Sequence, residues 1–208
     1  MYLGFDTSNY TTSVALFDGK NVFQSKKLLK VKSGERGLRQ SDAVFQHTVN
    51  MPELLAELEY DSFKLKAVGV STRPRNIDGS YMPCFTVGNS VANAVSKFTN
   101  APLYTTSHQV GHILSALYSV NRLDLINQEF IAFHVSGGTT EALLVKPDKD
   151  EIIKAEIIAE SLDLKAGQAI DRTGVLLGLT FPCGKEIDAL SLKSEKKYKI
   201  KPSMKGLN

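Results

Sequence analysis

The order of strands and helices is the feature that most constrains the fold of this chain. Three short apolar segments, at 3–7, 12–17 and 21–31, follow one another closely, and Asp18-Gly19 between the last two is the strongest hairpin signal in the sequence. Strands joined by so few residues pair in opposite directions. The chain is therefore expected to begin with three consecutive antiparallel strands.

Helices and strands alternate after this opening. A helix is expected from Ser41 or Asp42, one of which caps it, to Glu59, with Pro52 splitting or bending it. The elements expected next are a strand at 67–71, a helix at 87–99, a strand at 103–106 and a helix that carries His108 and His112. Antiparallel strands followed by such alternation predict an α/β fold, a mixed sheet with crossover helices.

The second half of the chain begins like the first. Expected strands at 130–136, 140–145 and 152–159 repeat the opening pattern. In each half, the turn between the first two strands is rich in glycine or hydroxyl groups, with the sequence D-T-S-N-Y-T-T in one and S-G-G-T-T in the other. Either turn alone is typical of an ordinary hairpin. As a pair they predict two phosphate-binding turns, one in each lobe.

The paired turns resemble those of the actin, Hsp70 and sugar-kinase superfamily. That resemblance implies a ribonuclease-H-like lobe at 1–129 and the beginning of an incomplete second lobe at 130–208. In the first turn, Asp6 is a candidate to hold a metal-bound water, and Thr7 and Ser8 are candidates for phosphate contacts.

Composition excludes several classes of protein. Of the 208 residues, 42% are hydrophobic and 23% are charged, which is ordinary for a globular domain and atypical of a disordered chain. No apolar run approaches the roughly 20 residues that cross a bilayer, and the N-terminus lacks a secretory pattern, so a cytoplasmic protein is expected. Cys84 and Cys183 are isolated and predicted to be buried. The net charge of +3 does not by itself indicate nucleic-acid binding.

Two histidines form a candidate metal site. His108 and His112 are four residues apart, so on a helix their side chains lie one above the other and can share one divalent ion. The same spacing also occurs where two histidines serve only packing or the surface. Residue 109 is glutamine, so the general-base glutamate of an H-E-x-x-H zinc protease is absent.

Four segments together are similar to the bacterial TsaD family and its archaeal and eukaryotic relatives. They are GFDTSNYTTSVALFD (4–18), SHQVGHILSA (107–116), HVSGGTTEALLV (134–145) and AESLDLKAGQAIDRTGVLLGLTFPCG (159–184). Members of that family, once called O-sialoglycoprotein endopeptidases, are tRNA threonylcarbamoyl-adenosine synthases. The resemblance implies a divalent metal, iron or zinc, that holds threonylcarbamoyl-adenylate for transfer to a tRNA adenosine. The nucleotide that it implies as a cofactor is ATP or this adenylate.

The resemblance also assigns residues. It makes His108 and His112 metal ligands, together with an aspartate from a segment beyond residue 208. The residues that it places along the adenylate phosphates are His134, Val135, Ser136, Gly137 and Gly138. Asp171 and Gly184 are expected to contact the nucleoside, although Asp171 also fits a helix-surface salt bridge and the 182–184 segment an ordinary turn.

Several positions depart from the family pattern. The acidic residues that usually follow the first turn are replaced by Asn9-Tyr10-Thr11, and the family's S-G-G-H-T has Thr139 in place of histidine. The family's small-residue A-G-P-G loop is replaced by a longer, basic loop at 72–83. Its Arg73 and Arg75 are either solvated or available to an anion. The family continues beyond residue 208, so a truncated chain or a shortened paralogue is expected.

Two functions therefore stay open. The first is a metal-dependent threonylcarbamoyl transferase that acts on tRNA, favoured by the two histidines. The second is a non-catalytic paralogue that binds nucleotide or dimerises as a scaffold, favoured by the missing acidic turn and by Thr139. A TsaB-like partner or a homodimer is expected from the resemblance in either case. A glycoprotein endopeptidase is a distant third, because the sequence offers no nucleophile paired with a base.

Overall fold

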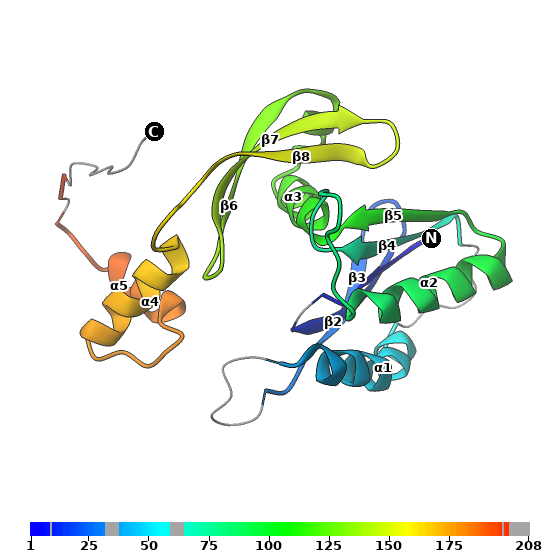
Figure 1. Cartoon of the computed structure of the whole chain (residues 1–208), viewed down its shortest axis with the longest axis horizontal. Helices are drawn as coiled ribbons and strands as arrows, with labels where there is room; N and C mark the ends of the chain where they lie inside the picture. The colour runs from blue at the N-terminus through cyan, green and yellow to red at the C-terminus, as the bar shows by residue number, and fades with distance from the viewer. Residues whose placement is uncertain (9, 32–37, 59–64, 197, 200–208) are drawn as a thin grey trace. The chain divides into compact units, whose positions relative to one another are not determined.

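The computed structural model describes residues 1–8, 10–31, 38–58, 65–196 and 198–199 (Figure 1). These residues group into two compact units, one of Met1–Ile131 with Leu144–Glu156 and one of Ala132–Leu143 with Ile157–Asn208. The predicted lobes at 1–129 and 130–208 stay a prediction. None of the helices in the described ranges is long and apolar enough to span a membrane.

The first unit contains a five-stranded mixed sheet in the order β3-β2-β1-β4-β5. β1 is antiparallel to β2 and β2 to β3, whereas β1, β4 and β5 run parallel. This topology confirms the predicted ribonuclease-H-like sheet. The strands of this sheet and the helices that alternate with them are β1 (Tyr2–Asp6), β2 (Thr11–Phe17), β3 (Val22–Leu28), α1 (Gln40–Ala56), β4 (Ala67–Arg73), α2 (Phe85–Thr99), β5 (Leu103–Ser107), α3 (His108–Ser119) and the 3₁₀ helix η1 (Leu123–Asn127).

The predicted β2–β3 hairpin is confirmed. Asp18 Oδ1 accepts hydrogen bonds from the backbone N–H groups of Lys20 and Asn21, each at 2.7 Å. Both bonds lower the pKa of Asp18, and the bond from Asn21 has the larger effect. Gly19 has φ +107°, a conformation that glycine adopts without steric cost. The short turn fixes the register that pairs Ser13 with Lys26.

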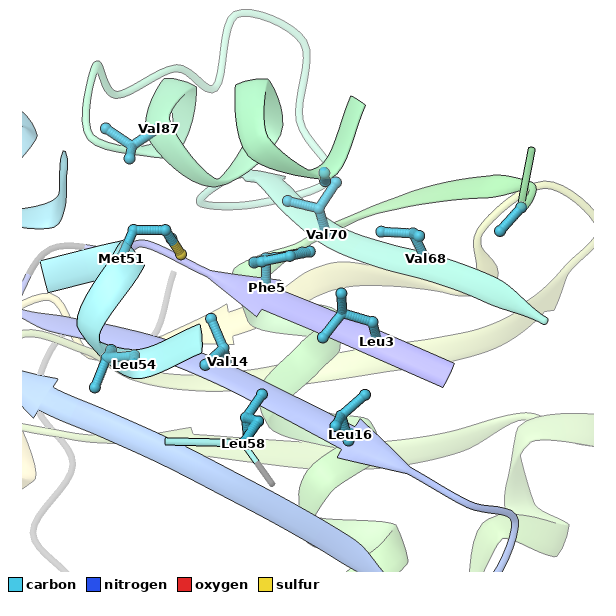
Figure 2. Close-up of a cluster of buried hydrophobic side chains, with 12 residues drawn as sticks. Leu3, Phe5, Val14, Leu16, Met51, Leu54, Leu58, Val68, Val70 and Val87 are labelled. Carbon is cyan, nitrogen blue, oxygen red and sulfur yellow. The ribbon is translucent and has the colours of Figure 1, made fainter. Parts of the chain in front are cut away.

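The main hydrophobic core lies between one face of this sheet and two helices, α1 and α2 (Figures 1 and 2). Alternate residues of each strand point into it, as period-2 patterning requires. Burying side chains of this size contributes about 1.5–3 kcal/mol each. The labelled core residues are Leu3, Phe5, Val14, Leu16, Met51, Leu54, Leu58, Val68, Val70 and Val87. α3 lies on the other side of the sheet (Figure 1).

Helix α1 differs from the prediction at its start and at its proline. The residue that precedes it is Arg39, in an extended conformation and without a side-chain capping bond, so the predicted cap at Ser41 or Asp42 is wrong. The helix is continuous through Pro52 and is not split there. Burial of Met51 and Leu54 on either side of the proline offsets the lost backbone hydrogen bond. Glu59, its expected end, lies outside the described residues.

The second group of strands repeats the opening pattern, as predicted. Three strands form a sheet in the order β6-β7-β8, and two helices follow them. Cys84 and Cys183 are fully buried, which confirms the expectation for both. The elements are β6 (Phe130–Val135), β7 (Thr140–Asp148), β8 (Ile152–Glu160), α4 (Ala166–Leu176) and α5 (Gly184–Ser191).

Candidate metal centre and phosphate-binding turn

His108 and His112 meet at the beginning of α3. β5 ends at Ser107, whose Oγ caps the helix by accepting a hydrogen bond from Val110 N at 3.2 Å. This cap places His108 in the first helical position and His112 one turn later. Their Nε2 atoms lie 2.9 Å apart, and their ring centroids 4.3 Å apart. The predicted pair therefore converges on one point.

The distance between the two Nε2 atoms is close to that expected for two ligands of one metal ion, but two ligands alone do not complete a metal site. Two imidazole nitrogens bound to one tetrahedral zinc lie about 3.3 Å apart, given bonds of about 2.0–2.1 Å. Neutral imidazole suits zinc and iron alike. Within the described ranges, no group of three or more His, Cys, Asp and Glu side chains is placed to hold a metal. Further ligands would have to come from water, substrate or other residues.

Asp6 lies directly behind His108. Its Oδ2 is 2.9 Å from His108 Nδ1 and accepts a hydrogen bond from Ser71 Oγ at 2.6 Å, while Oδ1 accepts one from Ser8 N at 2.8 Å. Burial by itself would raise the pKa of Asp6, but the bond to His108 and that group's charge, with Ser71 and Ser8, lower it to about 2. An ionised Asp6 accepts Nδ1–H, which leaves the Nε2 lone pair of His108 directed at His112.

Sequence reasoning missed Ser71. Its position follows from the parallel pairing of β1 with β4, which brings the carboxyl ends of both strands to one edge of the sheet. The signal available in the sequence was a hydroxyl residue near the end of β4, the strand that runs parallel to β1 and its Asp6. The expectation that Asp6 holds a metal-bound water stays a prediction, since its three hydrogen bonds are all within the chain.

The two hydroxyl residues after Asp6 have different surroundings. Thr7 is fully buried, and its hydroxyl donates to Cys84 O at 2.9 Å and accepts from Gly88 N at 3.1 Å. It thereby holds the beginning of α2 against the sheet. The carbonyl of Ser8 accepts a bond from Thr11 N, which closes the turn. The predicted phosphate contacts of both residues stay predictions, and Asn9 lies outside the described residues.

A cavity of about 510 Å³ opens beside the histidine pair. Asp6, Ser8, His108 and His112 line one part of it, and the β2–β3 hairpin contributes Ser13, Gln24 and Lys26. Gly111 and Ser115 of α3 have small side chains that leave this space open. The candidate metal ligands therefore face a polar cavity large enough for a small organic group.

In the second unit, the 136–140 turn is closed by its own hydroxyl groups. Ser136 Oγ accepts hydrogen bonds from Gly138 N at 3.2 Å and Thr139 N at 3.0 Å, and it lies 2.8 Å from Thr139 Oγ1. Ser136 N also donates to Thr139 O. Two of the N–H groups that could bind phosphate are therefore occupied, and an anion would have to replace Ser136 Oγ as their acceptor.

The N-terminus of α4 abuts this turn. Gly167 N donates to Ser136 O at 3.1 Å, and Ala166 N donates to Thr140 Oγ1 at 2.8 Å. A Cβ atom on Gly167 would lie only 2.6 Å from Gly137 N, so the approach requires glycine. The positive end of the α4 dipole thus adds to the turn's capacity to attract an anion.

His134 and Val135 precede the turn at the end of β6. His134 Nδ1 is 3.7 Å from a carboxylate oxygen of Glu141, which is only 4% exposed. Val135 is half exposed. Both expected adenylate contacts stay predictions.

Asp171 and Gly184 lie together in the same unit. Asp171 Oδ1 accepts a hydrogen bond from Cys183 N at 2.8 Å, and Gly184 is the first residue of α5. The helix-surface salt bridge considered for Asp171 is not formed with any described residue. A cavity of about 550 Å³ borders Asp171, with Gln168, Val175 and Phe181 among its lining residues. The carboxylate anchors the turn before α5 and keeps a second oxygen for another partner.

The basic loop after β4 is also engaged within the first unit. Arg73 forms an ion pair with Glu151, and Asn76 Nδ2 donates to the same carboxylate at 2.8 Å. Arg73 is thus paired with a carboxylate of the chain and is not available to a separate anion. The carboxylate is in the tight turn between β7 and β8, where Asp148 Oδ1 accepts from the backbone N–H of Glu151.

The predicted site residues fall into two groups. Asp6, Thr7, Ser8, His108 and His112 belong to the first unit. The second unit contains the predicted residues at the end of β6, in the turn after it and in the two helices after β8, namely His134, Val135, Ser136, Gly137, Gly138, Asp171 and Gly184.

The family model and the curated relatives that the chain resembles agree on one family. The family model for TsaD, tRNA N6-adenosine threonylcarbamoyltransferase, matches residues 27–208. A protein of that name from Enterococcus faecalis is 31% identical over 98% of the chain, and one from Thermosipho africanus is 35% identical over 91%. The matched segments cover 57% and 56% of those proteins, so the chain spans somewhat more than half the length of these curated relatives.

Solved structures resemble the chain more distantly. YeaZ from Pseudomonas aeruginosa is 12% identical, with a TM-score of 0.44, and the match covers 80% of this chain and 67% of YeaZ. An Aquifex aeolicus member of the Ppx/GppA family is 15% identical, with a TM-score of 0.36, over 76% of this chain and 51% of its own. Scores this low leave the fold assignment to the chain's own sheet topology.

Proposed function

The chain belongs to the TsaD family of tRNA N6-adenosine threonylcarbamoyltransferases, and from this premise we propose that it takes part in metal-dependent transfer of a threonylcarbamoyl group from its adenylate to a tRNA adenosine. The observation that carries the proposal is the convergence of His108 and His112 at 2.9 Å with Asp6 behind them. A histidine that only packs or faces solvent needs no carboxylate bonded to its Nδ1, whereas a metal-binding histidine usually has such a partner on the nitrogen that does not bind the metal.

Each side chain around the pair has a separate task in this reaction. His108 and His112 would hold zinc or iron through Nε2. When bound, the metal would supply Lewis-acid polarisation of the carbamoyl oxygen. Asp6 keeps the proton of His108 on Nδ1, so that Nε2 is available as a ligand, and Ser71 and Ser8 N keep the carboxylate in place.

The second unit supplies groups for the adenylate. We assign the phosphate to the turn at Ser136, Gly137 and Gly138, where the α4 N-terminus favours an anion. His134 and Val135 border that turn. The second carboxylate oxygen of Asp171 is available to ribose hydroxyls, and Gly184 lies beside it. A cytoplasmic location, a tRNA acceptor and a TsaB-like partner or homodimer stay predictions of the same proposal.

Metal binding tests the proposal directly. We expect the purified chain to retain close to one equivalent of zinc or iron, and the His108→Ala/His112→Ala double variant to retain none. Asp6→Asn should weaken metal affinity about 10- to 100-fold, because it removes the charge that orients His108. Asp18→Asn, in the exposed hairpin turn, is the matched control and should bind as the wild type does. Equal affinity in the Asp6 and Asp18 variants would count against the assigned roles.

A scaffold that binds no metal is the second candidate, and two observations favour it. The two Nε2 atoms are close enough to share a hydrogen bond when one of them carries the proton, so the pair can satisfy itself. Tyr10 and Thr11 also place no carboxylate in the first turn. Wild-type protein that stays metal-free after incubation with zinc would favour this candidate over transfer.

A further inference from the structure

Lys26 has no assigned role, yet it lines the cavity that His108 and His112 face. It is in β3, opposite Ser13 of β2. The adjacent Ser25 is buried on the α1 side, where its hydroxyl bonds the Glu57 carboxylate. Since neighbouring strand residues point to opposite faces, Lys26 points to the face that carries α3.

Gln24 supports this placement. It is two residues from Lys26 on the same face, and its Nε2 donates to Ser13 Oγ at 3.1 Å. Both side chains line the same cavity as the histidine pair. The hairpin therefore forms a wall of this cavity with a cationic group on it.

The charge of Lys26 is not neutralised by its neighbours. Lys27, the next residue, forms an ion pair with Glu53 on the opposite face. Lys26 forms no ion pair or hydrogen bond through its ammonium group with any described residue, and it is exposed to the cavity. Asp6, the carboxylate that lines this cavity, is engaged by His108, Ser71 and Ser8 N. The described part of the cavity thus offers one cation without a partner.

The group transferred in the proposed reaction has a matching charge. A threonylcarbamoyl group keeps the α-carboxylate of threonine, which is ionised at neutral pH. We propose that Lys26 binds this carboxylate and so orients the carbamoyl end toward the histidine pair. The inference rests on the proposed function, and it adds a substrate-positioning residue on β3. A single lysine–carboxylate contact at an exposed wall should change affinity about five- to ten-fold.

The test compares two small probes by isothermal titration calorimetry on the zinc-loaded 208-residue chain. N-carbamoyl-L-threonine carries the carboxylate, whereas N-carbamoyl-L-threoninamide has a neutral amide in its place. Wild-type protein should bind the first about five- to ten-fold more tightly. Lys26→Met, which keeps the apolar stem, should bind both equally, and Lys26→Arg should retain the preference. Lys20→Met, in the same hairpin but outside the cavity lining, is the charge-matched control and should behave as wild type.

Two results would overturn the role of Lys26: no carboxylate preference in the wild type, or an unchanged preference in Lys26→Met. Metal content, measured on the same samples, reports separately on the proposed function. Wild-type protein without bound zinc would count against transfer, and the probe comparison would then be made on that metal-free protein. Zinc-loaded wild type without a carboxylate preference would count against Lys26 alone.

Discussion

Protonation of His47 should destabilise the fold in mild acid. This histidine of α1 is fully buried, with Nδ1 2.8 Å from Thr12 Oγ1, and within the described residues its Nε2 has no hydrogen-bond partner. Burial lowers its pKa from 6.5 to about 4, although the nearby charge of Asp6 acts in the opposite direction. The folded state therefore keeps His47 neutral at pH values where the unfolded chain binds a proton.

The sign and size of the effect follow from this difference in pKa. Between pH 6.5 and about 4 the unfolded state binds the extra proton, so the free energy of unfolding falls as the pH falls. At about 1.4 kcal/mol for each pH unit, the loss is about 2 kcal/mol at pH 5 and at most about 3 kcal/mol near pH 4. Above pH 6.5 His47 contributes no pH dependence.

Urea unfolding of wild type and His47→Leu at pH 7, 6, 5 and 4.5 measures this loss. The stability difference between the two proteins should shift toward the variant by about 2 kcal/mol from pH 7 to pH 5. The comparison cancels the titration of other groups, which both proteins share. If the variant does not fold, the NMR titration of the wild-type His47 ring gives the same information. A constant difference across this range, or a ring that titrates near pH 6.5, would refute a buried neutral His47.

Two further substitutions test local packing by urea unfolding. Gly167→Ala places a Cβ atom 2.6 Å from the backbone of the turn that follows β6, so we expect a loss of about 1–3 kcal/mol. Gly138→Ala, with no atom within 4 Å of the added Cβ, should cost less, and an equal cost would argue against the contact. Thr12→Val removes the hydroxyl to which Asn50 Nδ2 donates, and should cost about 1–3 kcal/mol. Thr11→Val should change stability by less than about 0.5 kcal/mol, and similar losses for both would contradict the polar cluster.

The buried face of α1 shows where reading from the sequence fails. In the sequence, Val44, Phe45, Thr48, Met51, Leu55 and Leu58 recur at helical spacing, which predicts that they form the side of this helix facing the core. Phe45 is nevertheless 68% exposed, while the polar His47 and Asn50 are buried. Those two residues tolerate burial because the Thr12 hydroxyl of β2 supplies a partner for both. Hydrophobic periodicity contains no information about a hydrogen-bond partner that is 35 residues away along the chain.

The sequence predicted the histidine pair of the candidate site but not the residues that other strands bring to it. Helical spacing was sufficient to pair His108 with His112, because four residues on one helix fix the geometry locally. The contact between Asp6 and His108 joins positions 102 residues apart and depends on which strands are neighbours. The position of Lys26 could not be predicted for the same reason, because only the register of the β2–β3 pair determines which face of the sheet it lies on. Local motifs therefore predicted the pairing of the two candidate ligands, and strand pairing was needed to find the residues that contact them.

The contacts of Glu151 bear on how this chain can be divided for experiments. The polypeptide passes between the two units three times, after residues 131, 143 and 156, so a cut at any one of these positions releases neither unit. An expression fragment ending at residue 129 would follow the apparent boundary of the first lobe but omit Glu151. Arg73, whose side chain is only 26% exposed, would then lose its counter-charge. A soluble fragment of the first unit should therefore be built by joining residue 131 to residue 144 through a short linker, which retains the β7–β8 turn.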